Sequence, residues 1–278
     1  MFIIFVKKFF MTTTSSLFEK IPMKGIKNII VIASGKGGVG KSTVSANLAI
    51  ALARNGFKTA LVDADIYGPS IPKMFGIEDA RPEVTESDNK EVMAPIEKYG
   101  VKIMSIGFFV PPSQSLIWRG PMAANAITQL FENTQWGEID YMIIDFPPGT
   151  GDIQLTTVQK LNVAGAIIVT TPQGIALNDV RKAASMFTAP ELNVPLYGVV
   201  ENMSWFSPVG RPEEKYFLFG SGGGQKIASE YGIPLLGKVP LVAEVGEAAE
   251  QGKSVFNQPD KSVIQEFEKI AGQIISKS

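Results

Sequence analysis

Short apolar runs recur along the chain and alternate with longer segments of helical periodicity. The runs are rich in β-branched residues and predict buried strands within 28–34, 58–70, 101–109, 141–152, 164–172, 195–203 and 234–242. Helices are expected at 42–56, directly after Arg119, at 176–187 and from Ser262 to the end of the chain. A charged, less regular stretch, 72–95, predicts a surface excursion. Several strands are continuously apolar, so helices are expected to cover both faces of their sheet.

This alternation predicts the α/β class, with an open, doubly wound and mostly parallel sheet. In such a fold the ligand binds at the carboxyl ends of the strands. Residues 25–278 show no internal boundary and are expected to form one domain, preceded by a flexible leader, 1–24. The leader starts with an apolar run that has Lys7 and Lys8 in its middle, unlike a secretory signal. That run is shorter than the roughly 20 residues of a membrane span, so we expect a cytoplasmic protein; a membrane-surface anchor is the alternative interpretation.

The segment GKGGVGKST, between the first strand and the first helix, matches the phosphate-binding pattern GxxxxGK[ST]. Its glycines allow backbone N–H groups to turn toward phosphates, Lys41 neutralises the β and γ oxygens, and the Ser42 hydroxyl can ligate Mg²⁺. The following helix presents its N-terminus to the same phosphates. The residues expected to bind the nucleotide here are Gly35, Lys36, Gly37, Gly38, Val39, Gly40, Lys41, Ser42 and Thr43.

Composition restricts the chemistry available to this site. The 278 residues include 26 basic and 27 acidic side chains, no cysteine and no histidine. The chain therefore has no disulfide, no thiolate or imidazole metal ligand and no histidine general base. The balanced charge does not suggest a nucleic-acid partner. Catalysis is left to carboxylates, lysines, hydroxyls, backbone amides and a hard metal ion.

Carboxylates stand where two predicted strands end. Asp145 follows an apolar strand and is expected to lie on the Mg²⁺ side of the site, opposite Ser42. Asp63 and Asp65 are two apart in an extended segment, which would place them on the same side, where one helps to hold the metal and the other orients the attacking water. Helix or turn capping is the alternative role for these aspartates. The Gly149 N–H, in a proline- and glycine-rich loop, could approach the γ-phosphate.

Several motifs together resemble the deviant-Walker ATPases of the Mrp/NBP35 (ApbC-like) family, which carry iron–sulfur clusters: GKGGVGKST, LVDADIYGPSIP, DFPPGTGD, TTPQ, and ENMSWF followed by FGSGGG. The resemblance runs from Lys24 to the C-terminus. It implies a P-loop NTPase of the MinD, ParA and nitrogenase-iron-protein type, which hydrolyses ATP slowly with Mg²⁺ as a homodimer. It also implies that Lys36 reaches the partner's phosphates, that Asp65 orients water and that Asn202 reads adenine. Iron–sulfur apoproteins or scaffold proteins are the partners that it implies.

One departure concerns the iron–sulfur cluster. Family members that carry a cluster place a CxxC between the ENMS and FGxGGG segments, whereas this chain has FSPVGRPEEKYFLFG, Phe206 to Gly220. A cluster held there by thiolates is excluded, although the resemblance implies a cluster as cofactor. We therefore expect an ATP-dependent carrier or assembly factor that works through a partner's ligands.

The alternative function is that of a positioning ATPase like MinD or ParA, which acts by nucleotide-dependent surface binding. A membrane-positioning protein needs a basic amphipathic tail. Val263, Phe267, Ile270 and Ile274 form an apolar stripe, but the nearby charges nearly cancel, so the tail is expected to pack on the core and no membrane partner is expected. A tyrosine autokinase would need a C-terminal tyrosine cluster, and the last tyrosine is Tyr231.

Overall fold

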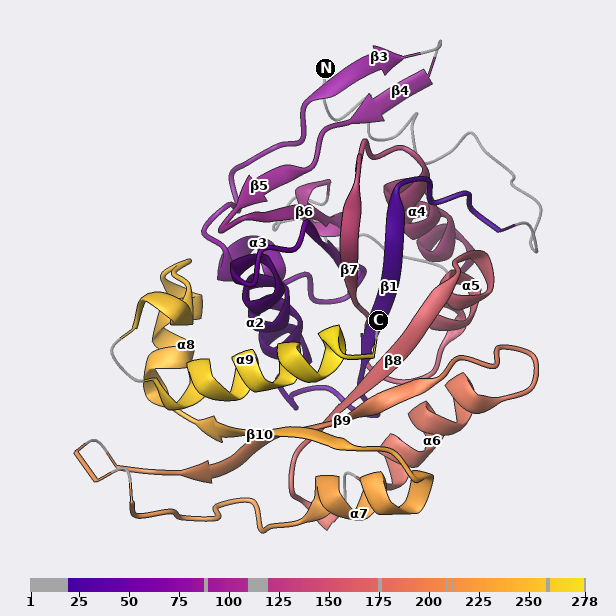
Figure 1. The fold of residues 1–278 in the computed structure, drawn as a ribbon. Coiled ribbons are helices and arrows are strands. Elements are labelled where there is room, and N and C mark those ends of the chain that lie inside the picture. Colours follow the sequence, from indigo (N-terminus) through magenta and orange to yellow (C-terminus); the bar gives the residue numbers. More distant parts are fainter. Residues whose placement is uncertain are drawn as a thin grey trace.

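In the computed structural model, a central sheet is covered by helices on both faces (Figure 1). The structure describes residues 20–87, 90–109, 120–174, 177–208, 210–211, 213–258 and 261–277. The strands are β1 (Ile26–Ala33), β2 (Thr59–Asp63), β3 (Val84–Ser87), β4 (Lys90–Met93), β5 (Ile96–Lys98), β6 (Val101–Ser105), β7 (Ile139–Asp145), β8 (Val163–Thr170), β9 (Leu196–Phe206) and β10 (Leu235–Leu241). The helices are α2 (Lys41–Arg54), α3 (Ile71–Met74), α4 (Gly120–Glu132), α5 (Asp152–Lys160), α6 (Leu177–Thr188), α7 (Gly223–Tyr231), α8 (Ala243–Glu250) and α9 (Ser262–Ile275), with 3₁₀ turns η1 (Ile106–Phe108) and η3 (Val255–Asn257).

The main sheet has the strand order β10-β9-β8-β1-β7-β2-β6-β5. All its neighbouring strands pair in parallel except β5, which runs antiparallel to β6 at one edge. Helices α2, α3, α8 and α9 lie over one face, and α4, α5, α6 and α7 over the other (Figure 1). The predicted open, doubly wound sheet is confirmed.

The expected strands are present, with shifted ends. The strand expected in 58–70 is limited to β2 and ends at Asp63. The stretch 72–95 contains most of α3 and the two-stranded antiparallel sheet of β3 and β4. Helices α5, α7 and α8 were not anticipated from the sequence. They have only nine, nine and eight residues, and α7 opens with two glycines, so each gives a weak periodic signal.

The two ends of the described chain both pack on the body of the protein. Helix α9 buries its stripe of Val263, Phe267, Ile270 and Ile274, each at most 2% exposed, which confirms that this face belongs to the core. Near the other end, Ile21 is buried and its N–H donates to the Lys160 carbonyl at 2.8 Å. The rest of the expected leader, residues 1–19, lies outside the described residues. Within the described part of the chain, no helix is both long and apolar enough to cross a membrane.

Parallel pairing aligns polar residues at the carboxyl edge of the sheet. Asp63 at the end of β2 is in register with Asp145 at the end of β7 and with Ser105 at the end of β6. Asp145 is also in register with Ile32, close to the end of β1. The strand ends thus bring both aspartates beside the loop that connects β1 to α2.

Candidate functional site

The loop from Gly35 to Gly40 forms a backbone cradle between β1 and α2. Gly38 and Gly40 have φ values of 78° and 79°, a region that side chains rarely adopt. The backbone N–H groups of Gly37, Gly38 and Gly40 donate to none of the residues described in the structure. Such unpaired donors at the N-terminus of a helix form an anion site.

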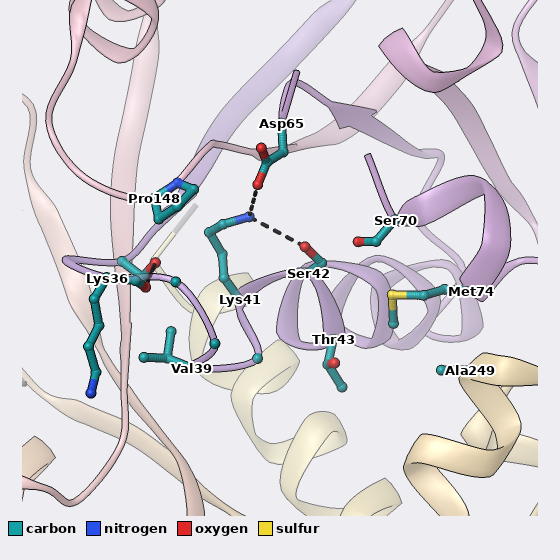
Figure 2. Close-up of a pocket in the computed structure, with 14 residues that line it drawn as sticks. Lys36, Val39, Lys41, Ser42, Thr43, Asp65, Ser70, Met74, Pro148 and Ala249 are labelled. Atoms are coloured by element: carbon teal, nitrogen blue, oxygen red, sulfur yellow. Dashed lines mark hydrogen bonds and ion pairs between the residues drawn. The ribbon is translucent and has the colours of Figure 1, made fainter. Parts of the chain in front are cut away.

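Lys41 is the first residue of α2, and its ammonium is buried among carboxylates. Its side chain is 6% exposed, and Nζ lies 2.8 Å from Asp145 Oδ1 and 3.7 Å from Asp65 Oδ2. Nζ also donates to Ser42 Oγ at 3.4 Å. Figure 2 shows Lys41 directed toward Asp65, while Lys36 extends from the other side of the loop, away from Lys41.

Asp63 is fully buried, and described donors occupy both of its carboxylate oxygens. Oδ2 accepts from Ser105 Oγ at 2.9 Å and from the Ile71 N–H at 3.2 Å, and Oδ1 accepts from the Asp65 N–H at 3.2 Å. Burial and the charge of Asp145 raise the pKa of Asp63 to about 7, against the lowering effects of Ser105 and Lys41. Asp63, which the sequence predicts as a metal ligand, thus links the end of β2 to β6 and α3 through hydrogen bonds.

Asp65 lies past the end of β2, in the turn that leads to α3. The alternation of side chains along a strand therefore does not place Asp65 on the same side as Asp63. The two carboxylates make different contacts, and Asp65 Oδ1 accepts from the Gly68 N–H at 3.3 Å. Burial raises the pKa of Asp65, with a smaller raising effect of Asp145, while Lys41 lowers it. A partly buried carboxylate of raised pKa, facing a cavity, is suited to hold a water molecule by hydrogen bonding.

Asp145 is completely buried, and its two oxygens have different environments. Oδ1 accepts from Lys41 Nζ at 2.8 Å and from Ser45 Oγ at 2.7 Å. Oδ2 has no hydrogen-bond partner among the described residues. A buried carboxylate oxygen without a partner calls for an additional group, such as a metal ion or a water molecule.

The charge balance of the site fits a divalent cation. Asp65 and Asp145 both lie within 4 Å of the Lys41 ammonium, so two carboxyl groups face one buried ammonium. Oxygen donors are the ligands that Mg²⁺ prefers. The Ser42 hydroxyl and Asp145 Oδ2, which has no partner among the described residues, therefore fit Mg²⁺.

The other predicted site residues make contacts within the chain. Lys36 Nζ donates to Gln173 Oε1 at 3.2 Å, and the Gly149 N–H donates to the Ser34 carbonyl at 3.0 Å. Asn202 is buried on β9, and its Nδ2 donates to the Val39 carbonyl at 2.9 Å. In this structure, therefore, Asn202 holds the backbone of the phosphate loop.

Sequence reasoning missed three polar contacts of this site. They are made by Ser45, Gln173 and Ser105. Ser45 follows Lys41 by one helical turn and shares its face of α2, so the spacing contained a signal for it. Gln173 ends the TTPQ motif, but its contact with Lys36 spans 137 positions, and Ser105 lies 42 positions from Asp63 and had no local signal.

A cavity of about 300 Å³ opens beside the loop. It lies between the cradle, Asp65 and Pro148, and continues toward Met74 of α3 and Ala249 of α8 (Figure 2). This is at the lower end of the usual size of small-molecule sites. Glycine backbone, a buried lysine and convergent carboxylates together provide a site for a polyphosphate with its metal ion.

Comparison with known proteins agrees with this geometry. A family model described as the ParA NUBPL iron-transfer P-loop NTPase matches residues 25–275. The iron–sulfur cluster carrier protein of Aquifex aeolicus is 46% identical over 261 residues, which cover 93% of this chain and 70% of the relative.

Solved structures are similar over most of their length. A nucleotide-binding protein of Archaeoglobus fulgidus in complex with ADP is 35% identical, with a TM-score of 0.74 over 88% of this chain and 93% of the other. The septum site-determining protein MinD of Pyrococcus horikoshii, complexed with Mg-ADP, has a TM-score of 0.63 over 89% of this chain and 96% of its own. Its identity is 23%, so this likeness shows the fold alone.

Proposed function

Because this chain belongs to the NUBPL iron-transfer P-loop NTPases of the ParA family, we propose that it is an ATP-hydrolysing carrier or assembly factor for iron–sulfur clusters that works as a homodimer. The observation that carries the proposal is the burial of Lys41 between Asp65 and Asp145, beside a glycine cradle whose N–H groups have no partner among the described residues. This constellation suits a nucleoside triphosphate with its metal ion.

ATP binding would use the loop backbone and Lys41. The N–H groups of the cradle donate to the phosphate oxygens, and Lys41 exchanges part of its contact with Asp145 for the β and γ oxygens. Ser42 and Asp145 would hold Mg²⁺, and Asp63 would support them by fixing the buried end of β2. When bound, Mg²⁺ neutralises charge on the phosphate oxygens.

Hydrolysis would then depend on positioning. Asp65 orients a water molecule toward the γ-phosphorus; a bond forms between that water oxygen and phosphorus, and the bond to the β–γ bridging oxygen breaks, which yields ADP and phosphate. In a homodimer, Lys36 leaves Gln173 and supplies positive charge to the partner's phosphates. Asn202 keeps the loop in place from its position near the nucleotide.

The loop after β7 is suited to report the state of the phosphates. Gln154 Nε2 donates to the carbonyls of Pro147 and Pro148 at 3.0 and 3.3 Å, and the Gly149 N–H donates to the carbonyl of Ser34, one residue past the end of β1. A γ-phosphate that takes the Gly149 N–H would displace this loop and α5, which begins at Asp152. Loss of phosphate would let them return.

The cluster itself would be cargo held by another protein's thiolates. The chain contains no cysteine and no histidine, including the Phe206–Gly220 stretch where the family places its CxxC. ATP would then drive cluster delivery from a scaffold protein to an apoprotein while both supply the iron ligands. A membrane-positioning role has less support, because the apolar stripe of α9 is buried in the core.

The proposal is tested by cluster transfer under anaerobic conditions. A cluster-loaded scaffold protein and an iron–sulfur apoprotein are mixed with this chain, Mg²⁺ and ATP, and the arrival of the cluster is followed by circular dichroism in the visible range. We expect ATP to accelerate transfer, and Lys41→Ala to abolish the acceleration. Equal transfer rates with the wild-type chain and with Lys41→Ala would reject the carrier function.

A second measurement tests whether the chain holds a cluster by itself. After reconstitution with iron and sulfide, the purified chain should show no stoichiometric cluster absorption in the visible range. A stoichiometric cluster on this cysteine-free chain would contradict the assignment of the ligands to partners.

A further inference from the structure

Ser45 is a buried hydroxyl beside the site that no sequence motif assigns. It lies on α2 one turn after Lys41 and has no exposed surface. Its Oγ is 2.7 Å from Asp145 Oδ1 and 3.1 Å from the Lys41 carbonyl. A serine hydroxyl has one hydrogen, so it can donate fully to only one of these acceptors. The shorter distance and the charge of the carboxylate favour Asp145.

This hydrogen bond makes the two oxygens of Asp145 inequivalent. Oδ1 is occupied by Ser45 and Lys41, whereas Oδ2 has no partner in the described structure. The terminal torsion of an aspartate is broad and roughly two-fold, so donors on one oxygen decide which oxygen faces the metal.

Lys41 alone cannot keep this orientation through a nucleotide cycle. A P-loop lysine contacts the β and γ oxygens when nucleotide is bound, and it then shares or gives up its contact with Asp145. Ser45 is the other described donor to Asp145 Oδ1, and it lies on α2, which packs against β1, β2 and β7. Its bond to Oδ1 therefore persists when Lys41 moves.

We infer that Ser45 is a positioning residue for the metal: it holds Asp145 Oδ1 and thereby leaves Oδ2 directed to Mg²⁺ in both nucleotide states. Partners that orient a ligating carboxylate typically contribute about 10-fold to 100-fold in metal affinity. This role rests on the proposed Mg²⁺·ATP site but not on iron–sulfur transfer.

The test measures metal affinity directly in Ser45→Ala. Alanine favours the helix and removes a single buried oxygen atom, so the variant should fold. Mn²⁺ is titrated into the full chain in the presence of ADP, and free Mn²⁺ is followed by electron paramagnetic resonance. We expect Mn²⁺ affinity to fall about 10-fold, while ADP affinity measured with EDTA by calorimetry changes less than about 2-fold.

Two controls separate positioning from general stability. Thr128→Val removes another buried helical hydroxyl, which donates to the Ala124 carbonyl at 2.9 Å, and should leave Mn²⁺ affinity unchanged. Ser45→Ala introduced into Asp145→Asn should cause no further loss of Mn²⁺ affinity, because the side chain that Ser45 orients is then no longer a carboxylate.

The outcomes distinguish this role from the proposed function. Wild-type Mn²⁺ affinity in Ser45→Ala, or an equal loss in the Asp145→Asn background, would overturn the positioning role while ATP binding stands. A wild-type chain that binds no Mn²⁺ with ADP would overturn both. Weaker Mn²⁺ binding in Ser45→Ala supports the role even if the wild-type chain transfers no cluster.

Discussion

Replacement of Lys41 by methionine tests whether its ammonium supports the fold as well as the nucleotide. Methionine keeps an unbranched apolar stem of similar length but removes the charge that faces Asp145 at 2.8 Å and Asp65 at 3.7 Å. Breaking a buried ion pair from one side typically costs about 3–5 kcal/mol, because the remaining charge is left unpaired. We expect a loss of that order in the free energy of unfolding at pH 8.

The pH dependence of this loss provides a sharper test. Lys41 lowers the pKa of both Asp63 and Asp65, so its removal raises both pKa values further. A carboxyl whose folded pKa exceeds its unfolded value stabilises the fold fully below the unfolded pKa and loses that contribution as pH rises through the folded pKa. The penalty in Lys41→Met should therefore be larger at pH 8 than at pH 5.5.

The assay is urea unfolding of both chains between pH 5.5 and 8.5, followed by far-ultraviolet circular dichroism. Lys36→Met serves as the control in the same loop, since the contact of Lys36 among the described residues is one partly buried hydrogen bond to Gln173, and its loss should cost less than about 1 kcal/mol. A penalty below about 1 kcal/mol for Lys41→Met at pH 8, or one that does not change with pH, would refute the reasoning.

Three further predictions concern the loop and the buried carboxylates. Lys36→Ala should still bind ATP but lose ATP turnover and the nucleotide-dependent dimerisation that light scattering detects. ATP hydrolysis at the wild-type rate in this variant would contradict the action of Lys36 on the partner's phosphates. Gly40→Ala should lower the free energy of unfolding by more than Gly38→Ala. Both positions have positive φ, which alone costs an alanine about 1–3 kcal/mol. A Cβ at Gly40 would also lie 2.1 Å from Asn202 Nδ2, whereas a Cβ at Gly38 would meet open space. Wild-type stability should decline from about pH 4 to pH 7 through Asp63, whose folded pKa is about 7, and the slope should be smaller in Asp63→Asn.

The sequence by itself determined the parallel strands of the main sheet, the longer helices and the class of ligand. Apolar β-branched runs specified the parallel strands, and the helical stripe of Val263 and Phe267 specified which face of α9 is buried. The cradle Gly35–Thr43 was identified because its function depends on contiguous backbone N–H groups. These properties are local: each depends on the spacing of residues within a dozen positions.

Only the tertiary structure decided the partners within the site. Lys41 meets Asp145 across 104 positions, and Asn202 reaches the Val39 carbonyl across 163. Such contacts follow from the order and register of the strands, which local periodicity does not encode. The same order placed Ser45, rather than Ser42, on Asp145 Oδ1, since the rotation of α2 over the sheet decides which of its hydroxyls faces the end of β7.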